Sequence, residues 1–197
     1  MNGCVRRKIS FNPRVHNPTA TPADKAARAR SLCEKGSWPD VLTLAEGWRA
    51  ESPDDAKAWF YCGAALAALG RFMEADTAYR RSLALDGSNV KAWNNLAKLS
   101  FEGLKRPAEA VKCLEQLIKV DPQNSLAWAN YASLNGQLGR HKEALDCAER
   151  ALAIDPHMVM AQLIRARAAQ GLGRPEIMRE ASAVLSQLPP EKFGRAT

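Results

Sequence analysis

Apolar residues recur along most of the chain with the three- and four-residue spacing of amphipathic helices. Long alternating runs of Val, Ile and Thr, which would indicate strands, do not occur in the sequence. A glycine turn follows one apolar segment, and a second turn, usually at a proline, follows the next. Two turns in each interval predict two helices in each interval. The pattern therefore predicts an all-α fold that is built from helical pairs.

The interval between equivalent positions is nearly constant, which indicates an internal repeat. Three tryptophans, Trp59, Trp93 and Trp128, follow one another after 34 and 35 residues. The turn residues keep the same phase, with Gly36, Gly70, Gly139 and Gly173 inside the pairs and Pro53, Gly87, Pro122, Pro156 and Pro190 between them. We divide the sequence into an N-terminal tail (1–21), five repeats (22–55, 56–89, 90–124, 125–158 and 159–192) and a C-terminal tail (193–197). The third repeat contains one extra residue, which we place in its internal turn at 101–107.

The repeat resembles the tetratricopeptide repeat, whose signature is W-x2-L-G-x2-Y, then A-x3-F, then P, over about 34 residues. The second, third and fourth repeats carry it as Trp59, Gly63, Ala75 and Gly87, then Trp93, Ala97, Ala110 and Pro122, then Trp128, Ala132, Ala144 and Pro156. The first and fifth repeats lack the tryptophan but keep Ala29 and Ala166 at the glycine position. The signature tyrosine is replaced by Leu66, Ser100 and Asn135 in the three stronger repeats. The resemblance covers 22–192 and implies an α-solenoid of about five helix-turn-helix repeats, wound into a right-handed superhelix.

Small residues at the signature positions predict where two helices cross closely, and the three tryptophans are expected to fill the space between neighbouring helices. The first helix has a favourable start at Thr21-Pro22-Ala23-Asp24, with a hydroxyl cap, a proline in the first turn and an acid near the positive helix end. The last helix has a single apolar stripe, formed by Ile177, Met178, Ala181, Val184, Leu185 and Leu188. We therefore expect the array to be complete within this chain.

Charge is unevenly distributed along the 197 residues, whose formal net charge is +7. The tail 1–21 contains Arg6, Arg7, Lys8 and Arg14 and no acid, so it contributes +4, and we expect it to be flexible. The repeats are close to neutral, which disfavours a nucleic-acid-binding fold. The protein is therefore not expected to bind nucleic acid.

The five cysteines form no CxxC pair, and their number is odd. Four of them, Cys33, Cys62, Cys113 and Cys147, fall inside helical patterns, which predicts reduced, buried thiols and not a disulfide framework. The most apolar run, 58–69, is too short to span a bilayer. We expect a cytoplasmic protein that does not insert into a membrane.

Catalytic constellations are not recognisable in the sequence. His16, His141 and His157 lie far apart, and no HExxH motif occurs. The segment Gly171-Leu172-Gly173-Arg174 resembles a phosphate loop only superficially, because no strand precedes it and no GK[ST] follows it. We expect a protein that is not an enzyme and that has no cofactor or metal site.

In the tetratricopeptide family the first helices of the pairs line a concave groove that binds a peptide. Carried over by register, the resemblance implies a groove formed by Arg30, Lys57, Phe60, Tyr61, Lys91, Asn94, Asn95, Lys98, Asn130, Ser133, Ile164 and Arg167. Asn95 and Asn130 occupy the same position in consecutive repeats, and a carboxamide both donates and accepts, so the two are expected to grip a peptide backbone. The bases in this set, together with the absence of acids, favour an acidic, extended peptide as the partner.

The function expected from these observations is a scaffold or adaptor that binds a peptide or helix of another protein. A first alternative is an assembly or secretion chaperone that sequesters an apolar segment of a client subunit. The apolar residues Met160, Leu163 and Ile164, beside Phe60 and Tyr61, favour this alternative. A second alternative is regulatory, with the tail 1–21 folding into the groove and blocking it.

Overall fold

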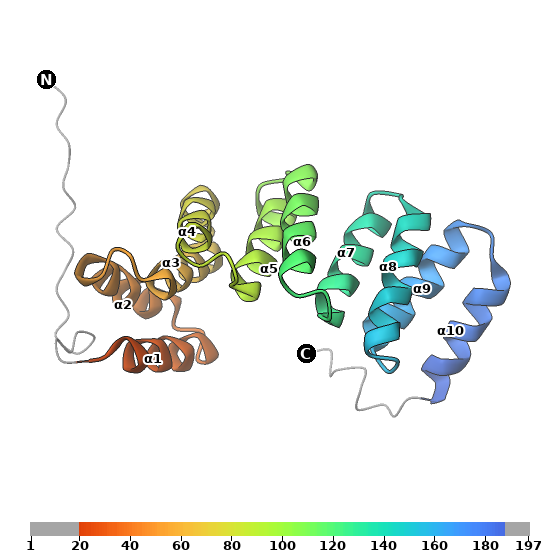
Figure 1. Ribbon diagram of the computed structural model, residues 1–197, viewed down its shortest axis with the longest axis horizontal. Coiled ribbons are helices and arrows are strands. Elements are labelled where there is room, and N and C mark those ends of the chain that lie inside the picture. Colours follow the sequence, from red (N-terminus) through yellow and green to blue (C-terminus); the bar gives the residue numbers. More distant parts are fainter. Residues whose placement is uncertain (1–19, 188–197) are drawn as a thin grey trace, which may run out of the picture. The chain divides into compact units, whose positions relative to one another are not determined.

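The computed structural model describes residues 20–187, and the chain divides into two compact units, one ending at Gly87 and the other beginning at Ser88. Within 20–187 the secondary structure is entirely helical, with no strand. The elements are α1 (Pro22–Glu34), α2 (Trp38–Glu51), α3 (Ala56–Ala68), α4 (Phe72–Leu85), α5 (Val90–Lys98), the π-helical turn η1 (Leu99–Gly103), α6 (Pro107–Val120), α7 (Ser125–Gln137), α8 (His141–Ile154), α9 (Val159–Gly171) and α10 (Pro175–Gln187). The predicted all-α solenoid fold of paired helices is confirmed (Figure 1). The predicted tail falls on residues outside the described range, apart from its last two, and the exact repeat boundaries stay predictions.

The first unit contains α1 to α4, and its first helix begins where the sequence predicts. The Thr21 hydroxyl accepts a hydrogen bond from the Asp24 backbone N–H at 3.2 Å, and the Asp24 carboxylate accepts one from the Thr21 N–H at 3.0 Å. This capping box satisfies two helix-end donors reciprocally. An ion pair between Lys25 and Glu51 joins the start of α1 to the end of α2.

An aromatic cluster forms the core of the first unit. Trp48 is 1% exposed, and its indole N–H donates to the Asp55 carboxylate at 3.1 Å. Tyr61 stacks on Trp48 with ring centroids 6.3 Å apart, and Phe60 meets Tyr61 edge-on at 5.2 Å. Phe60 also lies 6.1 Å from the ring of Tyr79. Because the four rings come from α2, α3 and α4, this cluster ties the two pairs of the unit together.

The small residue that the signature places in α3 marks a close helix crossing, as predicted. A Cβ atom on Gly63 would lie 2.8 Å from Cδ1 of Tyr79 on α4. Tyr79 is 2% exposed, so its ring has little room to move aside. The α3–α4 contact therefore depends on the missing side chain of Gly63.

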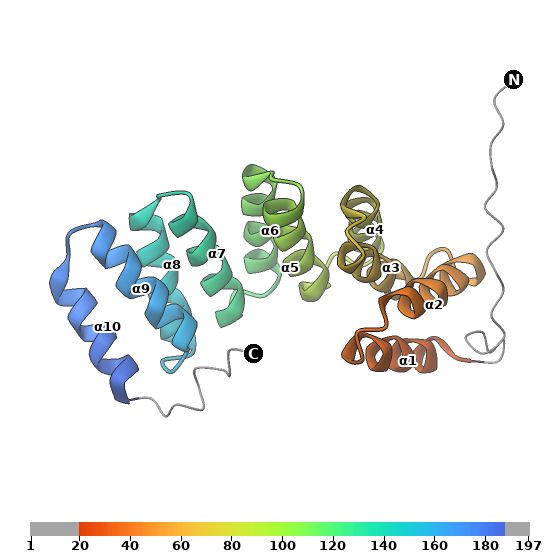
Figure 2. The same ribbon diagram turned by 180° about the vertical axis from the view of Figure 1, so that it is seen from behind.

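The second unit contains α5 to α10, and the pair α7–α8 lies between the pairs α5–α6 and α9–α10 in both views (Figures 1 and 2). Alanines allow the helices to approach, as in the cluster of Ala129, Ala151 and Ala161. Arg165 on α9 bridges to Glu149 on α8 at 3.8 Å and to Glu180 on α10 at 2.9 Å. Helix α10 buries Ala181 and exposes Glu176, which confirms its predicted amphipathic character.

The three repeat tryptophans are half-buried, and Trp128 packs against buried residues of α7, α8 and α9, as predicted for a residue that fills the space between helices. The indole N–H of Trp59 donates to the Pro53 carbonyl at 2.7 Å, and that of Trp128 donates to the Pro122 carbonyl at 2.9 Å. Each of these two rings is also covered by an arginine guanidinium. The Cζ atom of Arg49 lies 4.5 Å from the ring centroid of Trp59, and that of Arg150 lies 5.6 Å from the ring centroid of Trp128. Trp59 and Trp128 thus bind the first helix of their pair to the turn that precedes it.

The extra residue of the third repeat widens one turn. In the other four pairs the glycine of the internal turn has a positive φ of 66° to 76°. The equivalent position of the α5–α6 turn is occupied by Lys105, whose φ is 56°. The backbone bond that closes the α7–α8 turn runs from Arg140 N to Asn135 O and spans five residues. The corresponding bond from Arg106 N to Ser100 O, at 2.7 Å, spans six. The additional residue therefore lies between Ser100 and Arg106, within the predicted range, and η1 accommodates it.

Replacing Lys105 by glycine is expected to stabilise the second unit by up to about 1 kcal/mol, because a Cβ atom is strained at positive φ. The gain is partly offset by the greater freedom of glycine in the unfolded chain. Urea denaturation followed by circular dichroism measures the change. Lys105→Ala is the matched control, since it removes the same charge but keeps the Cβ atom. Equal stability of the two variants would show that φ at this position is not strained.

Candidate functional site

A pocket of about 250 Å³ opens on the second unit between α5 and α7. This α5–α7 pocket is smaller than the 300–1,000 Å³ that is typical of sites for drug-sized ligands, which suits it to a side chain and not to a whole cofactor. Its lining comes from α5, η1, α6 and α7. The lining residues are Asn94, Ala97, Lys98, Phe101, Glu102, Leu114, Asn130, Ser133, Leu134 and Gln137.

Two carboxamides meet at this pocket. The Asn130 Nδ2 donates a hydrogen bond to the Asn94 Oδ1 at 2.6 Å, so the two side chains join α7 to α5. A pair of carboxamides that shares one hydrogen bond keeps an NH2 group and a carbonyl oxygen for other partners, whichever amide donates. These are the donor and the acceptor that an extended peptide backbone needs.

The base of the pocket is apolar, and one side carries charge. Leu114 and Leu134 are buried, and Phe101 is half-buried beside them. Lys98 lies 3.9 Å from Glu102, and both side chains are mostly exposed, at 71% and 62%. The site can therefore bind an apolar group at its base and a charged group at its edge.

The structure brings together part of the predicted groove set. Asn94, Lys98, Asn130 and Ser133 all line the pocket, but Asn95 is not among its lining residues. The grip of Asn95 and Asn130 on a peptide backbone, which their equal register suggests, stays a prediction. In the structure the side chain of Asn130 bonds to Asn94. Phe101, which the register of the third repeat also places in the groove, lines the pocket as well. The sequence-based set omitted Ala97, Glu102, Leu114, Leu134 and Gln137.

Charge differs between the first and second helices of the pairs in the second unit. No acid lies within α5, α7 or α9, whose charged residues are Lys91, Lys98, Arg165 and Arg167. The second helices carry Glu109, Glu115, Glu143, Asp146, Glu149, Glu176 and Glu180. Because two of these acids bind Arg165, the cations of the first helices that remain exposed are Lys91, Lys98 and Arg167.

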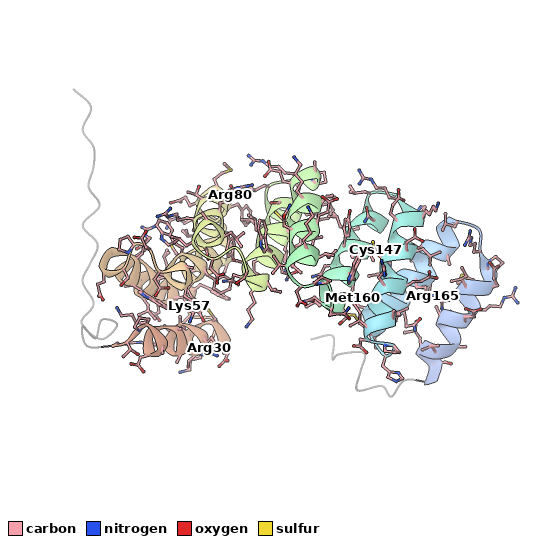
Figure 3. All side chains as sticks on the ribbon, viewed as in Figure 1. Arg30, Lys57, Arg80, Cys147, Met160 and Arg165 are labelled. Carbon is pink, nitrogen blue, oxygen red and sulfur yellow. The ribbon has the colours of Figure 1, made fainter. Side chains whose placement is uncertain are left out.

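Apolar side chains are also exposed on the first helices of this unit. Leu126 on α7 is 48% exposed and Leu163 on α9 is 51% exposed. Met160 on α9, labelled in Figure 3, is 36% exposed. The predicted groove residue Ile164 instead packs, half-buried, against the core cluster of Ala132, Cys147 and Ala148. The second unit therefore offers both polar and apolar surface on these helices.

The four predicted groove residues of the first unit differ in exposure. Arg30 and Lys57, both labelled in Figure 3, are exposed. Tyr61 is 8% exposed, and Phe60 is half-buried in the aromatic cluster. Burial raises the pKa of the Tyr61 hydroxyl, and the nearby Arg30 guanidinium acts in the opposite direction. The placement of these four residues in a groove stays a prediction.

The cysteines of the described residues carry no disulfide. Cys62, Cys113 and Cys147 are buried and Cys33 is half-buried, which confirms the expectation of buried thiols for the first three. Burial, with a smaller contribution from Asp146 and Glu143, raises the pKa of the Cys147 thiol to about 11, so the reactive thiolate is scarce near neutral pH.

Residues 20–187 contain neither a cluster of metal-binding side chains nor a helix that could span a membrane. Acidic, histidine and cysteine side chains do not gather there in a group of three or more that would hold a metal ion. Within the same range, every helix is too short or too polar to cross a membrane.

Comparisons with known proteins identify relatives of this architecture. Tetratricopeptide repeat family models match residues 56–99 and 99–159. The Caenorhabditis elegans protein "Tetratricopeptide repeat-containing protein trd-1" is 30% identical over 81 residues, and the human "Protein O-mannosyl-transferase TMTC3" is 33% identical over 91 residues. These matches cover 41% and 46% of this chain, but only 10% of each relative.

Among solved structures, a crystal structure of MamA superimposes with a TM-score of 0.72 at 16% identity, covering 81% of this chain and 95% of the other. MamA from Desulfovibrio magneticus RS-1 gives a TM-score of 0.67 at 17% identity, covering 88% of this chain and 98% of the other. At this level of identity the likeness concerns the fold alone.

Proposed function

The chain belongs to the tetratricopeptide repeat family, and from this premise we propose that it is a protein-interaction scaffold that binds an acidic, extended segment of a partner protein along α5, α7 and α9. The observation that carries the proposal is the charge of these three helices: α5 and α9 hold bases, α7 holds no charged residue, and none of the three holds an acid.

Two kinds of contact support binding. The Asn94–Asn130 pair offers a donor and an acceptor to the peptide backbone whatever the side chains of the peptide are. Lys91, Lys98 and Arg167 are exposed, so water and salt screen their charge, and they contribute mainly to the rate of association and to the choice of partner. The amides therefore supply binding to any backbone, and the bases supply the preference for acids.

The charge of this surface bears on the alternative in which the tail 1–21 blocks the groove. The tail carries four bases and no acid, so its approach to Lys91, Lys98 and Arg167 is opposed by like charge. We therefore favour a partner from outside the chain.

A chaperone that holds an apolar client segment is the second candidate. The exposed side chains of Leu126, Met160 and Leu163 favour it, because they lie on two first helices of the same unit. Such a client would bind without any requirement for acidic residues, which distinguishes the two functions.

The transferase activity in the name of the human relative is not carried over, because the matched residues make up 10% of that protein. The cytoplasmic location and the lack of an enzymatic activity stay predictions from the sequence.

Reversing the three exposed charges of the first helices, with Lys91→Glu, Lys98→Glu and Arg167→Glu together, is expected to abolish the selection of acidic peptides. Random peptides displayed on phage are selected on the wild-type protein, and the enriched peptides are titrated at low and high salt. Affinity should fall as salt rises, because exposed charges are screened.

The matched control is Lys112→Glu, Lys119→Glu and Lys142→Glu, which reverses three exposed charges on the second helices α6 and α8. This variant should bind the selected peptides as the wild type does. If the enriched peptides carry no acid, or if the control variant loses binding to the same extent, the proposal is wrong. Apolar peptides without acids would support the chaperone function.

A further inference from the structure

We infer that the π-helical turn η1 converts the α5–α7 pocket into a specificity pocket for one large apolar side chain that has a carboxylate beside it in the bound segment. The inference rests on the proposed function and specifies which residues of the acidic partner are recognised. Its occupant is an acidic peptide segment of another protein, because α5 and α9 carry bases and none of α5, α7 and α9 carries an acid.

The turn between α5 and α6, which contains η1, differs from the turns inside the other helical pairs. Four of the five described turns inside pairs are closed by a glycine at positive φ, but this one is closed by Lys105 after a π-helical turn. An inserted residue and a strained backbone that persist in an otherwise regular array are typical of functional sites. Here their effect is local, since η1 supplies Phe101 and Glu102 to the pocket lining.

The lining of the α5–α7 pocket combines apolar surface with an amide pair. Ala97, Phe101, Leu114 and Leu134 present apolar surface, and about 250 Å³ is enough for a side chain but small for a whole ligand. The amide pair of Asn94 and Asn130 lines the same pocket, so a backbone bound there would hold its side chain over the apolar base. A large aliphatic or aromatic side chain fits this arrangement, because it removes the most apolar surface from water.

Lys98 at the edge of the pocket is the group that a carboxylate of the ligand would bind. Lys98 and Glu102 lie 3.9 Å apart at the edge of the pocket, so a carboxylate of this chain already neighbours the lysine in the absence of a partner. A ligand carboxylate beside the apolar anchor would compete with Glu102 for Lys98. Glu102 therefore weakens the binding of acidic segments, and only a segment with both features gains from the site.

The test uses the peptide that phage selection on the wild-type protein enriches most, synthesised with a fluorescent label and titrated by anisotropy. The enriched peptides should share a large apolar residue with Asp or Glu next to it. Phe101→Ala should weaken binding about fivefold, because part of the apolar base is lost. Glu102→Gln should tighten binding about twofold at low salt, and not at all for a peptide in which the acid is replaced by its amide.

A second variant removes the π-helical turn. It replaces 101–105 by the four residues Ala-Ala-Leu-Gly, which form the regular turn at 67–70. This variant should keep the helical circular dichroism of the wild type and still bind acidic peptides, but it should lose the preference for an apolar anchor. It therefore tests the pocket without depending on Phe101 alone.

The results of these experiments distinguish a failure of the proposed scaffold function from a failure of the specificity pocket. If no acidic peptide is enriched on the wild type over the charge-reversed variant of α5 and α9, the proposed function fails. If acidic peptides are enriched but lack a shared apolar anchor, or if the η1 replacement binds them with unchanged preference, the scaffold function stands and the specificity pocket is refuted.

Discussion

Replacing Asn94 and Asn130 together by alanine is expected to weaken the binding of an acidic, extended peptide about tenfold or more. Each hydrogen bond between a carboxamide and the peptide backbone contributes about 1 kcal/mol net, because water competes for the same groups. Two such contacts correspond to about 2 kcal/mol, and 1.4 kcal/mol is a factor of ten in affinity. Both asparagines are half-buried and lie on helix surfaces, so the variant should remain folded.

The measurement is isothermal titration with a peptide selected on the wild-type protein, at two salt concentrations. The weakening should be the same at both concentrations, because the lost contacts involve neutral groups. Asn95→Ala is the matched control, since Asn95 is a half-buried asparagine on the same helix but does not line the α5–α7 pocket. A loss of affinity in Asn95→Ala as large as in the double variant would show that the peptide contacts Asn95, as its register suggests, and would contradict a grip by the Asn94–Asn130 pair.

Replacing Gly63 by leucine is expected to destabilise the first unit by about 1–3 kcal/mol, because the new side chain overpacks the contact between α3 and α4. Its Cβ atom alone would lie 2.8 Å from the ring of Tyr79, which packs against Phe60 in the aromatic cluster. The midpoint of urea denaturation, followed by tryptophan fluorescence in a Trp93→Phe and Trp128→Phe background, reports on this unit, because the remaining tryptophans Trp38, Trp48 and Trp59 all lie in it.

The matched control for this prediction is Gly136→Ala in α7. A Cβ atom at Gly136 would lie 3.8 Å from the Cβ of Ala144, which is an ordinary contact. Alanine also has the higher helix propensity, so this variant should be neutral or slightly more stable. An unchanged midpoint for Gly63→Leu would contradict the close helix crossing.

Periodic features of the fold were predictable because they depend on the local conformation of the chain. A glycine at positive φ ends the first helix of four pairs, and the sequence shows those glycines in constant phase. Thr21 and Asp24 likewise form the cap that their spacing predicts. Such features need no knowledge of how two helices cross.

The candidate site was predictable only in part, because it depends on the offset between neighbouring helices. Register places Asn95 and Asn130 at equal positions, but the side chain of Asn130 reaches Asn94 across the α5–α7 contact. One residue changes the direction of a side chain by about a quarter of a helical turn, so a small shift between helices changes the partner. The sequence therefore identifies the helix face and not the bonded pair.

The contribution of η1 to the pocket lining could not be predicted from the sequence, for a different reason. The extra residue is visible in the repeat length, but the sequence does not specify that the chain forms a wider helical turn there. Leu114 was missed because it has the spacing of a core residue in α6, and it is both a core residue and part of the pocket. The tryptophans were predicted as space-filling residues, whereas their N–H groups need acceptors, which the turns provide.

The bonds from indole N–H groups to proline carbonyls also affect how the chain folds. Donor and acceptor are six residues apart in both Trp59–Pro53 and Trp128–Pro122, so the loop that each bond closes is short. Closing a short loop loses little chain entropy, and proteins rich in contacts of low sequence separation fold fast. The direction in which a new helical pair leaves the preceding turn is thereby set by neighbouring residues, before any distant repeat has formed.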